Sequence, residues 1–423
     1  MREVLQRLER LEQQNQTLEG ELRALRQELA VSRQIPGAVT PPAQELAEEK
    51  IAVNTNRIEE LAQTKVETSR RLPLRITGTA LFNAFLNGKY SGAAENPTTA
   101  SLTRGPATGG ATMRQTVIGL QYDSPEALFG SKVNGTMYLD LFGGTTQSLN
   151  HLLRLRVATI ELNWKTRSFT VGQDKPIISP REPTSLAQVG VSPLTGAGNL
   201  WLWQPQAKFE QRFAFGSNSG LRAQTGLFQT NEASVNTPAE YAATLERARP
   251  ALEGRFEFWR KWGEGRRLEI APGFHTSSTH VAGTSVGSHI ASVDWLANIL
   301  PKVEVTGMFF SGQNVAGLGA LRQGFTITND NVKPVHSKGG WAQVHIAATE
   351  STSFNFYGGQ QNDRASDLTP GGINKNQNYF ANVMYRIAPN VIVSLEGGQV
   401  RTRYVGQGTR RNNHYDLAIG YLF

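Results

Sequence analysis

From Leu74 onward, apolar and polar residues alternate along the chain with a period of two, which places one set on each face of a β-strand. The pattern is clearest at 414–423, where Tyr415, Leu417, Ile419 and Tyr421 lead to a terminal Phe423. A soluble protein seldom leaves such an apolar strand with a free edge, because the edge invites aggregation. A closed barrel in a lipid bilayer accounts for the pattern, and the edge strand of a soluble β-sandwich is the alternative.

Sixteen segments have this alternation, and the connections between them alternate in length. The expected strands are 74–87, 113–123, 132–143, 153–166, 167–175, 200–215, 220–230, 250–262, 267–276, 287–299, 303–312, 339–349, 352–361, 377–388, 390–403 and 414–423. Long gaps follow the odd-numbered strands, at 88–112, 144–152, 176–199, 231–249, 277–286, 313–338, 362–376 and 404–413. Even-numbered strands are followed by short turns, such as 165–167 and 216–218. This alternation is typical of an up-and-down membrane barrel with long extracellular loops and short periplasmic turns. We therefore predict an all-β fold, a 16-stranded antiparallel transmembrane β-barrel over 73–423.

Residues 1–33 have a helical period instead. Apolar residues recur at alternate spacings of four and three, the pattern of a coiled-coil seam. The seam is Val4, Leu8, Leu11, Asn15, Leu18, Leu22, Leu25 and Leu29. It predicts an α-helical coiled coil that oligomerises, although the heptads do not separate dimer from trimer, and a helix elsewhere in the chain could be the partner. Residues 34–72 are expected to form a Pro-rich spacer and a second, weaker helix.

Composition adds a few limits. The 423 residues contain no cysteine, so disulfides and thiolate metal sites are excluded. No run of 18 apolar residues occurs, so no transmembrane helix is expected. The net charge of +8 suits nucleic acid, an anionic lipid surface or an anion-conducting lumen. The chain starts on a charged helix rather than a signal peptide, so an exported barrel would have lost its export signal.

The whole pattern resembles a bacterial outer-membrane porin, in which a terminal Phe and alternating aromatics help to direct barrel assembly. The heptads, the Pro-rich spacer and the second helix resemble the DcaP-like porins, as do 63–67, 72–76 and 81–85 at the start of the first strand. This resemblance implies a homotrimer with a periplasmic coiled coil. It also implies that the third long loop, 176–199, folds into the lumen and narrows it.

Candidate selectivity residues come from that loop and from the inward positions of the strands. Successive side chains of a strand alternate between the two faces, a relation that we call parity. A charge that faced lipid would cost about 2–4 kcal/mol at the bilayer midplane, so charged positions are expected to face the pore. The constriction candidates are Asp174, Lys175, Arg181 and Glu182. The residues expected to face the pore are Asp140, Lys208, Glu210, Arg212, Arg222, Glu253, Arg255, Glu257 and Arg386. Basic members outnumber acidic ones, which favours anions and small carboxylates. Arg154 and Arg156 have ambiguous parity that a bulge near Val157 would resolve.

The sequence contains only weak matches to catalytic, metal-binding or nucleic-acid-binding motifs. The segment 283–287 matches the nucleophile pattern G-x-S-x-G, but it lies between two strands rather than between a strand and a helix. His275 and His280 lack an evident third metal ligand. Basic residues are spread through the chain rather than clustered in one stripe for nucleic acid. We therefore predict no catalytic, cofactor or metal site and no nucleic-acid partner.

Two functions remain from different classes. The first is a trimeric outer-membrane channel for passive diffusion of small hydrophilic solutes, with a modest preference for anions or small carboxylates. The second is a structural anchor that links the outer membrane to peptidoglycan through the coiled coil. Both put the barrel among outer-membrane lipid and lipopolysaccharide of a Gram-negative bacterium, with the coiled coil in the periplasm. A barrel enzyme would need a cluster of catalytic residues that the sequence does not show.

Overall fold

A computed structural model describes residues 73–144, 151–230, 237, 239–242, 245, 250–263, 265–329 and 331–423, together with Gly20, Ala24 and Gln27. The predicted coiled-coil seam lies outside these residues, and so do the spacer and the second helix, so their organisation stays a prediction. No helix among the described residues is long and apolar enough to cross a membrane.

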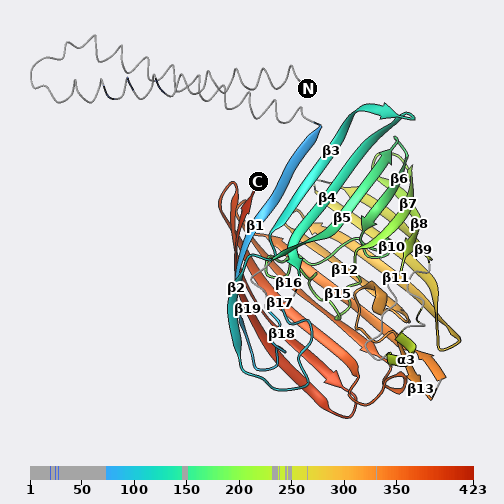
Figure 1. Cartoon of the computed structure of the whole chain (residues 1–423). Helices are drawn as coiled ribbons and strands as arrows, with labels where there is room; N and C mark the ends of the chain where they lie inside the picture. Colours follow the sequence, from blue (N-terminus) through green and yellow to red (C-terminus); the bar gives the residue numbers. More distant parts are fainter. Residues whose placement is uncertain are drawn as a thin grey trace, which may run out of the picture. The chain divides into compact units, whose positions relative to one another are not determined.

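Most of the described chain forms one closed antiparallel sheet (Figure 1). Its strands are β1 (Leu74–Asn87), β2 (Thr108–Thr112), β3 (Val117–Leu128), β4 (Ser131–Gly143), β5 (Leu152–Asn163), β6 (Arg167–Asp174), β7 (Gln204–Ala214), β8 (Ser219–Gln229), β9 (Pro250–Trp262), β10 (Arg266–Val281), β11 (Thr284–Leu300), β12 (Val303–Gln313), β15 (His336–Ala347), β16 (Thr352–Asp363), β17 (Ile373–Ala388), β18 (Val391–Tyr404) and β19 (Gly408–Leu422). The connections contain α3 (Ala239–Ala242), η1 (Ala316–Leu318), the hairpin β13 (Phe325–Thr328) and β14 (Asn331–Pro334), and η2 (Ala365–Asp367).

Strands β2 and β3 both pair with β1 and act as two parts of one barrel strand. The interruption between them is bridged by Thr116, whose Oγ1 accepts a hydrogen bond of 3.0 Å from the Leu81 amide. The barrel therefore has sixteen strands, which confirms the predicted sixteen-stranded antiparallel barrel. It closes between β1 and β19, which pair from Thr79 opposite Leu422 to Asn87 opposite His414.

The barrel has two different ends, which we call the loop end and the turn end. Short turns join β5 to β6 and β17 to β18 at the turn end, and Leu74 and Phe423 lie there too. Two predicted long loops at the other end were wrong. Strands β10 and β11 continue to a two-residue turn at Ala282 (φ 48°) and Gly283 (φ 69°), and β18 and β19 extend in the same way. The apolar alternation fades in these extensions while the hydrogen-bond ladder continues, so hydrophobicity alone could not reveal them.

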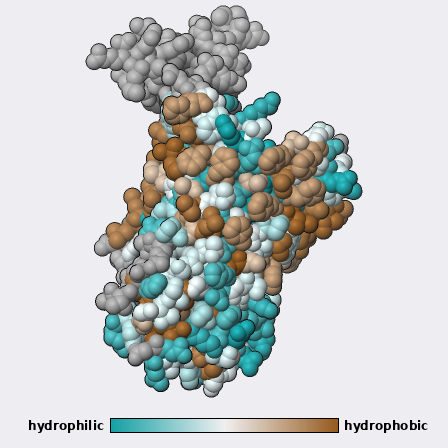
Figure 2. Space-filling view, turned by 90° about the vertical axis from the view of Figure 1, so that its right-hand side faces the viewer, coloured by the Kyte–Doolittle hydropathy of each residue, from teal (hydrophilic) through white to brown (hydrophobic). Residues whose placement is uncertain are grey.

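The two faces of the barrel differ in chemistry. Apolar side chains of the outer face are exposed, among them Phe256, Phe356, Leu395 and Tyr415. Figure 2 shows one side of this face, where hydrophobic residues gather across the middle and hydrophilic ones cover the end that carries the long loops. Inward positions on the same strands are polar or charged, such as Asn355 and Glu396. This arrangement is the one expected for a barrel surrounded by lipid.

Connections at the loop end are held together by a second small core and by a buried carboxylate. Val281, Val286, Phe325 and Val332 pack together there. Asp367 of η2 contacts the Lys333 ammonium at 2.7 Å and accepts hydrogen bonds from the His336 backbone and ring at 3.1 and 2.8 Å. Burial alone would raise the pKa of this carboxyl, but these partners lower the pKa to about 2.

Candidate functional site

A long loop between β6 and β7, residues 175–203, runs inside the barrel, and we call it the inner loop. Its apolar residues Ile178, Leu194, Ala197 and Leu200 are buried. They belong to a core with inward side chains of the barrel wall: Met308, Phe310, Trp341, Tyr357 and Phe380. One side of the lumen, along β12 and β15 to β17, is therefore filled with packed side chains.

Polar contacts fasten the inner loop along its whole length. Near its start, the Ile177 amide donates to Glu253 of β9 at 2.6 Å. In the middle, the Thr184 amide donates to Gln343 of β15 at 2.6 Å. Ser185 then donates to Glu396 of β18 at 2.7 Å, and the Val189 amide donates to Gln115, between β2 and β3, at 2.6 Å. These anchors lie on widely separated strands, so the loop crosses the lumen rather than following one wall.

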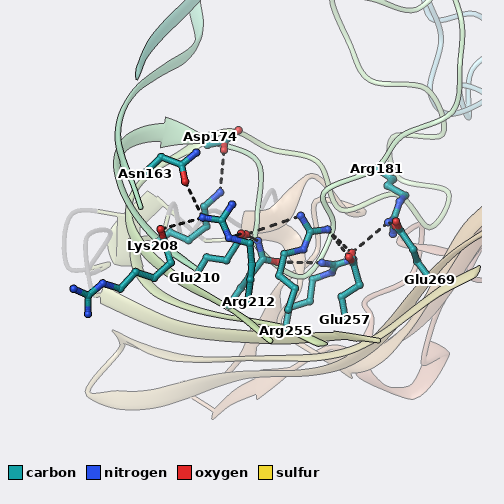
Figure 3. Close-up of polar contacts among 12 residues, drawn as sticks. Asn163, Asp174, Arg181, Lys208, Glu210, Arg212, Arg255, Glu257 and Glu269 are labelled. Carbon is teal, nitrogen blue, oxygen red and sulfur yellow. Dashed lines mark hydrogen bonds and ion pairs between the residues drawn. The ribbon is translucent and has the colours of Figure 1, made fainter. Parts of the chain in front are cut away.

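Arg181 is the charged anchor of the inner loop. Its guanidinium contacts Glu269 of β10 and Asp294 of β11, and it lies 3.4 Å from Glu257 of β9. Figure 3 shows Arg181 reaching from the loop toward Glu269 and Glu257. The sequence analysis predicted Arg181 and Glu257 as pore residues but did not predict that they are in contact. It did not identify Glu269 or Asp294.

The inner wall beside this anchor carries a row of paired charges (Figure 3). Arg255 contacts Glu257 at 2.7 Å and Asp294 at 2.7 Å. Arg222 of β8 lies 2.5 Å from Glu257 and 4.0 Å from Glu210 of β7. The alternation along the strands predicted the inward positions of Glu210, Arg222, Arg255 and Glu257. They lie on the inner face because β7, β8 and β9 pair without a register shift.

Further charge pairs continue the row toward the loop end and the turn end. Lys208 lies 3.5 Å from Asp174, and Lys175 lies 2.7 Å from Glu182. Arg212 lies 3.6 Å from Glu210 and donates to the side chain of Asn163 at 2.7 Å. The candidates Asp174, Lys175 and Glu182 therefore extend the same row of charges as the strand residues.

Arg154 and Arg156 also face the lumen, on β5. The β4–β5 register shifts between Tyr138 and Leu139, which leaves Arg156 as the extra residue of a bulge close to the anticipated position. Arg154 forms a two-pronged contact with Asp140, at 3.1 and 2.6 Å, and Arg156 lies 3.5 Å from the same carboxylate. Both guanidiniums lie over the Trp203 ring, 5.3 and 4.7 Å from its centroid. The alternation of faces along β5 could not assign these two arginines, because the extra residue of the bulge interrupts that alternation.

The remaining candidates are placed less centrally. Arg386 has inward parity on β17 but is exposed near the turn end, where its backbone amide donates a hydrogen bond to the Ser351 carbonyl at 2.8 Å. Glu253 is buried beneath the inner loop and lies 3.2 Å from His275. Among the described residues, no group of three or more His, Cys, Asp or Glu is placed to hold a metal ion.

Most of the lumen carboxylates are more deeply buried than most of the lumen cations, although Arg255 is also buried, with 1% of its side chain exposed. The carboxylates of Asp140, Glu253, Glu257, Glu269 and Asp294 are at most 3% exposed. By contrast, basic side chains of β5, β7, β8 and the inner loop keep between 12% and 37% of their surface exposed. These are Arg154, Arg156, Lys175, Arg181, Lys208, Arg212 and Arg222. Among the acidic side chains of β5 to β7 and the inner loop, Glu161, Asp174, Glu182 and Glu210 are also partly exposed.

Comparison with known proteins gives matches in structure only. No family model and no curated protein matches the sequence. The outer-membrane channel DcaP of Acinetobacter baumannii matches with a TM-score of 0.68 at 15% identity, over 83% of this chain and 97% of that one. The anion-selective porin of Comamonas acidovorans matches with a TM-score of 0.56 at 11% identity, over 83% and 99%. OprB of Pseudomonas putida matches with a TM-score of 0.55 at 10% identity, over 86% and 96%. The described chain thus has the fold of the outer-membrane porins, a sixteen-stranded barrel consistent with a DcaP-like porin.

Proposed function

We propose that this protein is an outer-membrane channel for passive diffusion of small hydrophilic solutes, with a modest preference for anions or small carboxylates. The observation that carries the proposal is the unequal exposure of the lumen charges. The inner loop and the inner face of β5, β7 and β8 carry guanidinium and ammonium groups that keep 12–37% of their side-chain surface exposed. Most of their carboxylate partners lie beneath them, against the wall or the loop.

The physics of a narrow passage supports a preference for anions. An ion in the passage approaches the exposed cations more closely than the buried carboxylates, and Coulomb energy falls with distance. The carboxylates still neutralise part of the positive field, and Glu161, Asp174, Glu182 and Glu210 do so at the passage itself. The expected selectivity is therefore modest, and these basic groups are expected to lower the barrier for anions without binding one tightly.

Electrical recording tests this proposal directly. The purified full chain in a planar bilayer should give stable conductance steps, and a potassium chloride gradient should give a reversal potential of the sign set by chloride. Raising the salt concentration should weaken the preference, because the Debye length falls from about 10 Å at 0.1 M to about 3 Å at 1 M. A protein that inserts but stays electrically silent would instead support the structural anchor.

The oligomeric state is part of the proposal. The heptads from Val4 to Leu29 support association in the periplasm, and a homotrimer is the state that the resemblance to DcaP-like porins implies. Deleting residues 1–43 should weaken the trimer while leaving the barrel folded, since the barrels are expected to contribute their own contacts. Native mass in mild detergent would check this, and a full chain with the mass of one protomer would contradict the trimer.

A further inference from the structure

The outer face of β15 to β19 carries a cluster of basic residues close to the loop end. Its members, which we call the basic belt, are Lys338, Lys375, Arg401, Arg403 and Arg411. Their inward neighbours in sequence, including Ser337, Asn376, Thr402 and Asn412, are buried, so the belt residues point outward. Pore selectivity does not account for charges on this side of the wall.

The belt is continuous across the strands. Lys338 pairs with Asn362, Asn362 with Lys375, and Lys375 with Arg403. One row nearer the middle of the barrel, Arg401 pairs with Arg411. The outward positions between them are Gln360, Asn362, Gln377, Gln399, Thr409 and Asn413, so no carboxylate interrupts the belt. Within the part of the chain that the structure describes, none of the five belt residues forms an ion pair.

The belt stands next to the edge of the apolar surface. Phe309, Tyr379 and Tyr415 are 48%, 53% and 56% exposed on the same outer face, and the apolar residues Val344, Phe356 and Leu417 follow toward the turn end. Aromatic residues mark the headgroup level of a membrane barrel. The basic belt therefore lies beside these aromatic residues, on their side away from the apolar surface, where the headgroups of the outer leaflet are expected.

A groove of about 390 Å³ opens on this face and joins the apolar surface to the belt. Gly340, Ala342 and Gly358 leave its floor without large side chains. Trp295, Phe309 and Tyr379 form apolar walls, and Lys338 and Asn362 line it where the belt begins. The groove thus offers an apolar trough with a positive charge at one end.

We propose that this surface binds a phosphorylated, acylated lipid of the outer leaflet, with the chemistry of the lipid A part of lipopolysaccharide. An acyl chain would occupy the groove, and the phosphates would lie against Lys338 and its neighbours in the belt. Charge complementarity favours this occupant over a second copy of the chain, because charged residues are depleted at the cores of protein interfaces. The inference rests on the proposed function only in placing the barrel in the outer membrane.

Lipid binding by the full chain in detergent tests the proposal, with native mass spectrometry to count bound molecules. The probes are bisphosphorylated lipid A and the same lipid A without its phosphates. The belt variant carries Lys338→Gln, Lys375→Gln and Arg403→Gln. A matched control carries Arg260→Gln, Arg266→Gln and Lys302→Gln, which remove three exposed charges near the turn end.

We expect the belt variant to bind the phosphorylated probe about tenfold more weakly or worse, since each basic residue near an anionic surface contributes appreciably. The control should bind the phosphorylated probe like the wild type. Lipid A without phosphates should bind the belt variant, the control and the wild type with similar affinity. A second variant, Ala342→Phe, fills the groove without changing charge and should weaken both probes.

Three outcomes would overturn the lipid site. The first is wild-type affinity in the belt variant, and the second is an equal loss in the control. The third is a belt variant that falls apart into protomers while its lipid binding is unchanged, because this face would then be a protein interface. Conductance of the belt variant should remain that of the wild type. A channel that conducts without selective lipid binding would reject this inference alone, whereas a silent wild type would reject the proposed function.

Discussion

Removing residues 421–423 is expected to lower the yield of folded barrel by at least about tenfold, because it shortens the β1–β19 pairing that closes the sheet from nine residue pairs to seven. Tyr421 and Leu422 pair with Ala80 and Thr79 of β1. Phe423 adds two backbone hydrogen bonds with Gly78, at 2.9 and 3.1 Å. In lipid each backbone group left without a partner costs several kcal/mol, so the shortened pairing is strongly disfavoured.

Point variants separate the backbone contribution from that of the ring. Phe423→Ala keeps the two backbone hydrogen bonds but removes a ring that packs against the Gly78 backbone. It should reduce the folded yield less than the deletion does. Tyr385→Ala removes an aromatic that is 50% exposed on the outer face near the same end, and it is the matched control. The folded fraction can be followed by the heat-dependent shift in electrophoretic mobility, and an unchanged yield after the deletion would contradict the closure.

The barrel could be predicted well from the sequence. All sixteen strands were recognisable because outward positions must be apolar along the length that lipid covers, whatever the rest of the molecule does. The ends of the strands were not recognisable on that basis. At 277–286 the side chains are mostly polar or small, yet Val281 and Thr284 still pair across a two-residue turn. Backbone hydrogen bonds continue the two strands there, although apolar and polar side chains no longer alternate.

The lumen was harder to predict than the wall. Parity placed Lys208, Glu210, Arg222 and Arg255 because their strands are regular, and it could not place Arg154 because of the bulge on β5. The partners of the inner loop depend on contacts across large separations in sequence, such as Arg181 with Asp294. The inward aromatic core was also missed, since Phe310 and Phe380 make sense inside the barrel only when the inner loop covers them.

These contacts give the inner loop two separate roles that mutations can distinguish. Its apolar residues pack against one side of the lumen, along β12 and β15 to β17. Its charged anchor, Arg181, fixes the loop and adds a cation that is 17% exposed. Arg181→Ala should therefore loosen the loop and raise conductance. Arg212 and Arg222 lie on rigid strands, so their loss should change the field with little effect on the width of the passage.

Replacing Arg181, Arg212 and Arg222 together with alanine is expected to move the permeability ratio toward cations, far enough to reverse a modest anion preference. A unit charge about 8 Å from the ion contributes on the order of 1 kcal/mol at an effective dielectric constant of about 40, roughly fivefold in relative permeability before screening. The triple variant also leaves Glu210, Glu257 and Glu269 with fewer cationic partners, which adds to the shift.

Reversal potentials under a potassium chloride gradient measure this change. The control is the triple alanine variant of Arg260, Arg266 and Lys302, which removes as many positive charges from exposed positions near the turn end. Single replacements should have smaller effects, because neighbouring charges overlap within a Debye length of about 8 Å at physiological salt. If the lumen variant kept the reversal potential of the wild type, these side chains would not face the narrow part of the pore. The exposed cations would then not set selectivity, even though the barrel and its inner loop are as described.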